Sequence, residues 1–161
     1  MKKIFLITFL FLFISVSAEV LRGGVYEEYI PKGFFGSWGV ISKMKSATNP
    51  QKFNYSSKDI WMLSGQGNIL ILQNLESGAY SEIEIKEKSI EGKTLKFTRQ
   101  KIVKTKDGKQ IQKEMVEFSL NGKNFSGTDK FMLENYDKDN NFKNADSATY
   151  EIEGVKISGS D

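Results

Sequence analysis

The 161-residue chain contains no cysteine, no histidine and only two prolines. Without Cys it can form no disulfide bond, so a packed core must stabilise the fold. The absence of both Cys and His excludes thiol catalysis, Ser-His relays and the usual zinc sites. Chemistry with carboxylates alone would need two acids in one cleft with separated pKa values. The acids, such as Glu82, Glu84 and Glu87, are instead spaced as on a solvated face. We therefore expect no enzymatic activity, no metal site and no cofactor.

Residues 1–18 have the composition of a secretory signal peptide. Lys2 and Lys3 precede an apolar run from Ile4 to Val16, and small residues follow it up to Ala18. The run is shorter than the roughly 20 apolar residues that a spanning helix needs. We expect cleavage near Glu19, export to the periplasm or beyond, and no stable membrane anchor in the mature protein.

The part that follows the signal peptide has the length of one domain. Residues 19–33 are a lead-in of mixed character, and residues 34–161 are the expected folded unit. Removing Lys2 and Lys3 from the 23 basic residues leaves 21, against 20 acidic residues. A net charge near +1 provides no concentrated basic face, so we expect no nucleic-acid partner.

Alternating apolar and polar residues predict strands along most of this unit. The first runs over 34–44, where Trp38, Val40 and Met44 share one face. The turn pairs Asp107-Gly108 and Asn121-Gly122 are typical of tight hairpins. The other predicted strands are 59–64, 68–74, 79–88, 94–103, 110–120, 124–136 and 148–158. Eight strands joined by short turns favour an all-β, eight-stranded antiparallel up-and-down barrel, with an open β-sandwich as the alternative.

The hairpin over residues 59–74 departs from this alternation because both of its faces are apolar. Ile60 and Met62 alternate with Trp61 and Leu63, and residues 69–72 repeat the pattern. A strand of this kind is covered on both sides. The outer cover could be the segment 25–30, a second subunit or a partner protein, and we expect the segment 25–30.

The sequence Gly36-Ser37-Trp38, at the head of the first strand, resembles the Gly-x-Trp signature of the lipocalins and the wider calycin superfamily. Residues 35–42 also resemble the first strand of intracellular fatty-acid-binding proteins. The resemblance implies a cup for a small hydrophobic molecule, with Gly36 and Trp38 as a structural plug at the closed end. In many members an Arg of the last strand covers the Trp. Here Arg22 and Arg99 both lie elsewhere, and Lys156 is the nearby cation, so that feature is missing or replaced.

Two functional hypotheses follow. The first is an exported protein that holds a hydrophobic or aromatic ligand inside the barrel. The second is a protein-binding module, such as an inhibitor or an envelope assembly factor, with a filled barrel. A continuous internal cavity above roughly 300 Å³, lined by the aromatic residues named below, would favour the first hypothesis, and a solid core the second. The candidate ligand-binding residues, each of which core packing alone would also explain, are Trp61, Tyr80, Phe97, Phe118 and Phe131.

Overall fold

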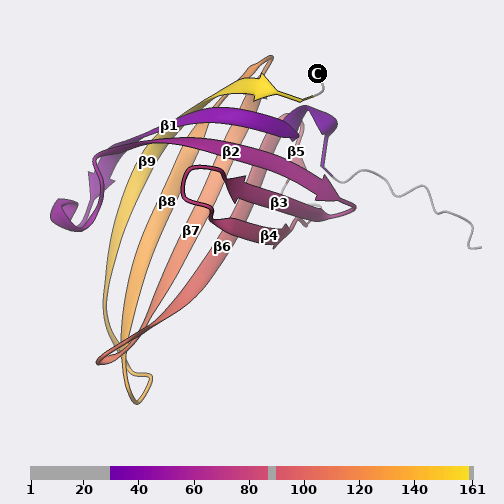
Figure 1. Cartoon of the computed structure of the whole chain (residues 1–161). Helices are drawn as coiled ribbons and strands as arrows, with labels where there is room; N and C mark the ends of the chain where they lie inside the picture. Colours follow the sequence, from indigo (N-terminus) through magenta and orange to yellow (C-terminus); the bar gives the residue numbers. More distant parts are fainter. Residues whose placement is uncertain (1–29, 87–89, 160–161) are drawn as a thin grey trace, which may run out of the picture.

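A computed structural model describes residues 30–86 and 90–159 (Figure 1). The predicted signal peptide, and all of the segment 25–30 except Ile30, lie outside the described residues. In the described part no helix has the length and apolar character needed to cross a membrane. The elements are the short 3₁₀ helices η1 (Lys32–Phe34) and η2 (Pro50–Lys52) and the strands β1 (Gly36–Ala47), β2 (Ser56–Gln66), β3 (Ile69–Asn74), β4 (Tyr80–Glu84), β5 (Ile90–Glu91), β6 (Thr94–Thr105), β7 (Gly108–Asn121), β8 (Asn124–Asp137) and β9 (Phe142–Ser158).

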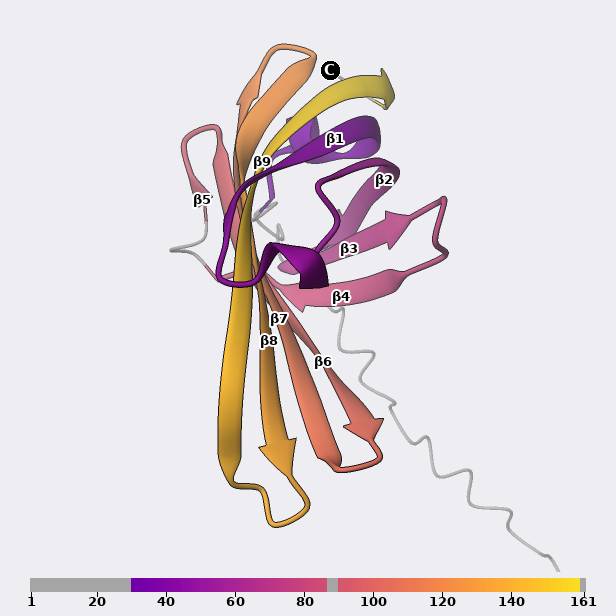
Figure 2. The ribbon, with the colours of Figure 1, turned by 90° about the vertical axis from the view of Figure 1, so that its left-hand side faces the viewer.

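The strands form one antiparallel sheet in the order β4-β3-β2-β1-β9-β8-β7-β6-β5. Pairing of β1 with β9 joins the two halves of the chain, and all other pairs are neighbours in sequence. The sheet curls until β4 and β6 approach each other (Figure 2). Across this gap Arg99 Nη1 donates a hydrogen bond to Ser81 Oγ at 3.2 Å. The result is a nearly closed up-and-down barrel, which confirms the predicted fold class. The eight predicted strands are β1–β4 and β6–β9, and the two-residue β5 was not predicted.

The two halves of the sheet differ in length. Strands β6 to β9 have 12 to 17 residues, whereas β3 and β4 have six and five. The lower ends of the long strands therefore run past β1–β4 and project from the barrel (Figures 1 and 2). This leaves one end of the barrel closed by packed side chains and the other end open along the inner face of the long strands.

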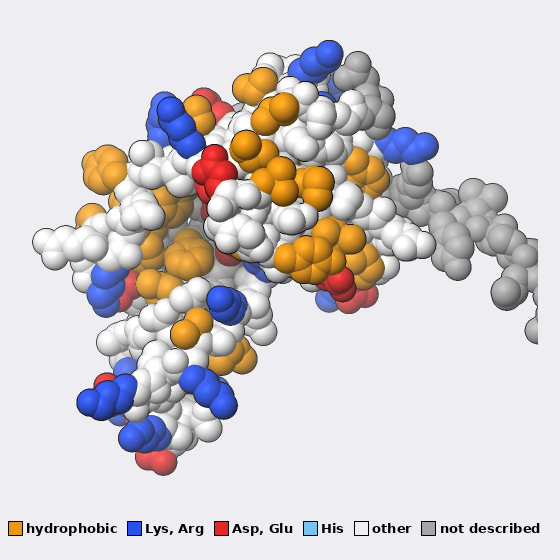
Figure 3. Space-filling model, viewed as in Figure 1, with side chains coloured by type: hydrophobic (Ala, Val, Ile, Leu, Met, Phe, Trp, Pro, Cys, Tyr) orange, Lys and Arg blue, Asp and Glu red, His pale blue; other side chains and the backbone are white. Residues whose placement is uncertain are grey.

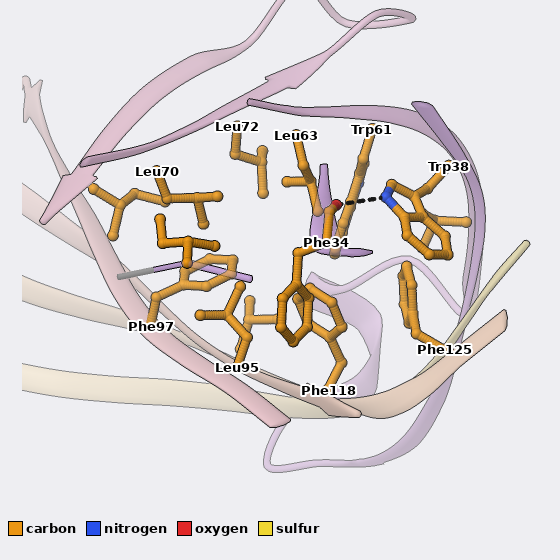
Figure 4. Packing of buried hydrophobic residues seen from close by; sticks show 14 of the residues in the cluster. Phe34, Trp38, Trp61, Leu63, Leu70, Leu72, Leu95, Phe97, Phe118 and Phe125 are labelled. Carbon is orange, nitrogen blue, oxygen red and sulfur yellow. Dashed lines mark hydrogen bonds between the residues drawn. The ribbon is translucent and has the colours of Figure 1, made fainter. Parts of the chain in front are cut away.

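The closed-end core is built from rings on the inner face of the sheet. Trp38 lies opposite Trp61 in the β1–β2 pair, and Leu95 lies opposite Phe118 in the β6–β7 pair. The Phe118 and Phe125 rings lie 4.5 Å apart between centroids (Figure 4). Each such side chain gains roughly 1.5–3 kcal/mol from burial. We call closed-end core the set Phe34, Trp38, Leu63, Leu95, Phe118 and Phe125.

Trp38 is fully buried at the centre of this core. Its Nε1–H donates to the Phe34 carbonyl at 2.9 Å, and its ring lies 5.2 Å from that of Phe125 between centroids. Lys156 Nζ lies 5.3 Å from the centroid of the indole and donates to the Gly33 carbonyl at 3.2 Å. A lysine of the last strand thus occupies the position over the Trp that the resemblance associates with Arg.

Gly36 begins β1 in a conformation that side chains disfavour. Its φ is +124°, and a Cβ there would lie 2.0 Å from the Ser158 carbonyl oxygen. Only glycine lets the first strand approach the end of β9 this closely. The glycine therefore closes the β1–β9 seam beside Trp38.

The outer face of the 59–74 hairpin carries a half-buried apolar surface, which we call the outer patch. Val155 and Ile60 flank Gly39 in the sheet, and the Ile157 side chain approaches Gly39. Val155 and Ile157 are 58% and 61% exposed. Hydrophobic side chains are visible over this face (Figure 3). The patch is formed by Ile41, Ile60, Met62, Ile71, Val155 and Ile157.

Candidate functional site

A polar layer follows the closed-end core on the same inner face of the sheet. Residues two apart in a strand point to the same side, so each inward apolar residue is followed by an inward neighbour two positions away. Along β6 the step runs from Phe97 to Arg99, and along β7 from Val116 to Glu114. The same step leads to polar residues on β2, β8 and β9. We call polar layer the set Asp59, Arg99, Glu114, Asp129 and Tyr150.

The polar layer borders a cavity of about 320 Å³ that opens to solvent. Hydrophobic side chains are visible in a hollow between the β1–β2 connection and the long strands (Figure 3). The ring of Phe53, from that connection, meets Phe131 edge-on at 6.3 Å between centroids. Aromatic walls therefore alternate with polar groups. The lining residues are Ser42, Lys52, Phe53, Asn54, Ser56, Ser57, Asp59, Trp61, Asn74, Arg99, Glu114, Asp129, Phe131 and Tyr150.

Arg99 and Glu114 form an ion pair between β6 and β7. Arg99 Nε donates to Glu114 Oε2, and their side chains are only 24% and 13% exposed. Arg99 is the only arginine in the described part of the chain, and its bond to Ser81 ties β6 to β4. A guanidinium can hold several donors in one plane, which suits this three-strand contact. The pair fixes the geometry of the cavity wall where the sheet is least closed.

Asp129 lies next to this pair. Its Oδ1 is buried and has no hydrogen-bond partner among residues 30–86 and 90–159. The pKa of Asp129 is raised from 3.8 to about 8, first by burial and then by the charge and the hydrogen bond of Glu114, while the charge of Arg99 opposes the shift. Near neutral pH Asp129 therefore carries a proton that it donates to Glu114, so that two carboxyl groups share one proton.

Asp59, on the opposite wall, is held by neutral donors. Ser57 Oγ donates to Asp59 Oδ2 at 2.8 Å, and Asn74 Nδ2 donates to Asp59 Oδ1 at 2.9 Å. Tyr150 completes the layer, and burial together with the charge of Asp129 raises the pKa of its hydroxyl. At the rim, Lys52 forms an ion pair with Asp146. The Asp59 and Glu114 carboxylates are thus held in place by their donors.

The predicted ligand-binding residues fall into two groups. Trp61 and Phe131 line the cavity. Tyr80, 55% exposed, borders a neighbouring hollow of about 410 Å³ that also contacts Phe131. Phe97 and Phe118 are buried in the hydrophobic core. Three of the five therefore lie beside the ion pair, including Trp61, which is also part of the buried core, and Phe97 and Phe118 do not.

The sequence prediction contains only aromatic wall residues and does not include the polar layer. A signal was nevertheless present. Arg99 continues the phase of Leu95 and Phe97, and Glu114 continues that of Phe118. A charged residue in the inward phase of a barrel strand is costly to bury without a partner. Such residues on neighbouring strands indicate a shared polar site.

No protein-family model, no curated protein and no solved structure matches the chain. The described residues also contain no group of three or more His, Cys, Asp or Glu placed to hold a metal ion.

Proposed function

We propose that this chain is an exported small-molecule-binding protein whose ligand occupies the open end of the barrel. The cavity beside the polar layer is the observation that supports this function. Its volume of about 320 Å³ suits a compact ligand. The rings of Trp61 and Phe131 can contact an apolar or aromatic part, and the adjacent polar groups can orient it. Export is supported by the composition of residues 1–18.

The closed end of the barrel leaves no room for a ligand. Trp38, Phe34 and Phe118 are completely buried, so the closed end is filled by protein. A wholly apolar ligand deep inside the barrel would have to displace these rings. The ligand that we propose combines an apolar or aromatic part with polar groups and sits against the polar layer.

Native mass spectrometry of the purified mature chain tests this function. We expect small aromatic probes to bind with a stoichiometry of one, and a co-purified ligand to be retained under gentle conditions. Ser42 is buried and lines the cavity, so Ser42→Leu should abolish binding by filling the space. Ser126→Leu, at an exposed position of β8, is the matched control and should leave binding intact. Equal binding by both variants would place the ligand elsewhere.

A protein-binding module is the second candidate, and the outer patch favours it. Contiguous exposed apolar surface on a sheet is typical of an interaction site. Here the partner, a second copy or another protein, would cover Val155 and Ile157. Ile157→Lys should then abolish self-association or partner capture while probe binding stays unchanged.

A further inference from the structure

We propose that the ligand carries a protonated amine, which binds between Asp129 and Glu114 in the cavity. This inference rests on the proposed function and specifies the chemical class of the ligand. It comes from the charges of the cavity wall and from the one buried oxygen there that the structure leaves without a partner.

The cavity holds more carboxyl groups than its cations can serve. Three carboxyl groups line it, on Asp59, Glu114 and Asp129. The two cations in the lining are already engaged, because Arg99 donates to Glu114 and Ser81, and Lys52 pairs with Asp146. The site therefore has an excess of acceptors over positive donors. A ligand that brings a positive charge corrects this imbalance, whereas an anionic ligand would increase it.

Asp129 marks the place for that charge. Its buried Oδ1 has no partner within the described residues, and leaving such an acceptor unpaired costs free energy. Without a ligand the two carboxyl groups share a proton, and the Arg99 guanidinium pairs with Glu114. An ammonium group supplies the same charge with three donors, so it can pair with both residues at once.

The aromatic lining fits the same ligand. Trp61, Phe131 and Tyr150 line the same cavity as the carboxyl groups. A cation next to ring faces gains additional electrostatic attraction when water is excluded. An arylalkylamine would place its ring against these walls and its ammonium at Asp129.

Binding of an amine should displace the shared proton. The affinity for the amine is then expected to rise with pH up to about 8, because above that pH Asp129 is already ionised before the amine binds. Glu114, Arg99 and Tyr150 interact electrostatically with Asp129, and the other charged groups of the cavity lining are Asp59 and Lys52. Most of these are held in ion pairs or by donors, so Asp129 is the group whose proton a ligand can replace.

Isothermal titration calorimetry with matched probes tests the inference. The pairs are phenethylamine with 2-phenylethanol, tryptamine with tryptophol, and hexylamine with hexanol. We expect at least one amine to bind about tenfold or more tightly than its alcohol at pH 7. Its binding enthalpy should vary with the ionisation enthalpy of the buffer, in proportion to nearly one released proton.

Two variants make the test specific. Asp129→Asn should fold normally, because it resembles the protonated acid, yet it should lose the amine preference and the proton release. Asp107→Asn makes the same charge change at the exposed β6–β7 turn, where Asn-Gly serves as well as Asp-Gly, and it should change nothing. Alcohols that bind as tightly as their amines would overturn the inference and leave the proposed function standing. Absence of binding by every probe would overturn both.

Discussion

The two ends of the barrel interior are built on the same strands and have opposite chemistry. At the closed end Trp38, Phe118 and Phe125 fill the space with rings. Two residues after Phe97 on β6 and four residues before Phe118 on β7, Arg99 and Glu114 face the same interior and border a cavity. The comparison teaches that one strand can contribute to packing and to a binding site in successive inward positions. The boundary lies where the long strands leave the cover of β1–β4.

Breaking the closed end should have the largest effect. Trp38→Ala removes a fully buried indole and its hydrogen bond to Phe34, so we expect a loss of about 3–5 kcal/mol in the free energy of unfolding. Urea unfolding followed by circular dichroism measures this loss. Trp38→Phe keeps a ring in place and should cost clearly less. A loss below about 1 kcal/mol for the alanine variant would show that the indole does not stabilise the barrel.

At the open end, stability should depend on pH through Asp129. The pKa of this group is raised to about 8 in the folded state from an ordinary 3.8, so the folded protein holds the proton more tightly than the unfolded chain. This contribution is fully present below about pH 4 and is lost as pH rises to about 8. The expected slope is at most about 1.4 kcal/mol per pH unit.

Urea unfolding at several pH values measures this slope. Asp129→Asn should flatten the curve between about pH 4 and 8 and should be more stable than the native chain above about pH 8. If the native chain and the Asn variant had parallel stability curves over that range, Asp129 would not be the source of the pH dependence.

The β1–β9 seam offers a smaller test of the closed end. Gly36→Ala combines a positive φ with a Cβ close to the Ser158 carbonyl, and we expect a loss of roughly 1–3 kcal/mol. Gly67 also has a positive φ, but a Cβ there would meet nothing within 4 Å. Gly67→Ala should therefore cost less in the same urea experiment. Equal losses would mean that the close approach to β9 contributes nothing.

The smallest effect is expected for the cation above Trp38. Lys156→Met keeps an aliphatic chain but removes the ammonium that lies 5.3 Å from the indole centroid. A loss of about 1 kcal/mol is expected from the cation–π contact and the hydrogen bond to the Gly33 carbonyl together. Lys130→Met, at an exposed position of β8, is the control, and thermal melts of the two variants should differ by a few degrees. Identical melting temperatures would show that the Lys156 ammonium does not stabilise the closed end.

Much of this architecture was accessible from the sequence, because period-two patterns and Gly turns are local signals. The barrel could be predicted directly from the strand that begins near Trp38 and from the turns at Asp107-Gly108 and Asn121-Gly122. The two-residue β5 has too little pattern to be recognised.

The site was less predictable because it depends on which strands become neighbours. Glu114 and Asp129 are fifteen residues apart and approach each other only through the register of β7 and β8. Asp59 joins them from another part of the barrel. The sequence alone cannot report that burial and Glu114 together raise the pKa of Asp129. It also cannot separate Phe118, which fills the core, from Phe131, which lines the cavity.

The two tryptophans of the chain allow the central comparison to be measured directly. Trp38 lies in the closed-end core and Trp61 lines the cavity, so Trp38→Phe and Trp61→Phe each leave one emitter. When the Trp38→Phe variant is titrated with a probe that binds, the emission of Trp61 should shift or be quenched until the site is saturated. The emission of Trp38 in Trp61→Phe should stay constant while calorimetry shows that the probe binds. A change in Trp38 emission equal to that of Trp61 would place the ligand inside the closed end and contradict the division of the barrel described above.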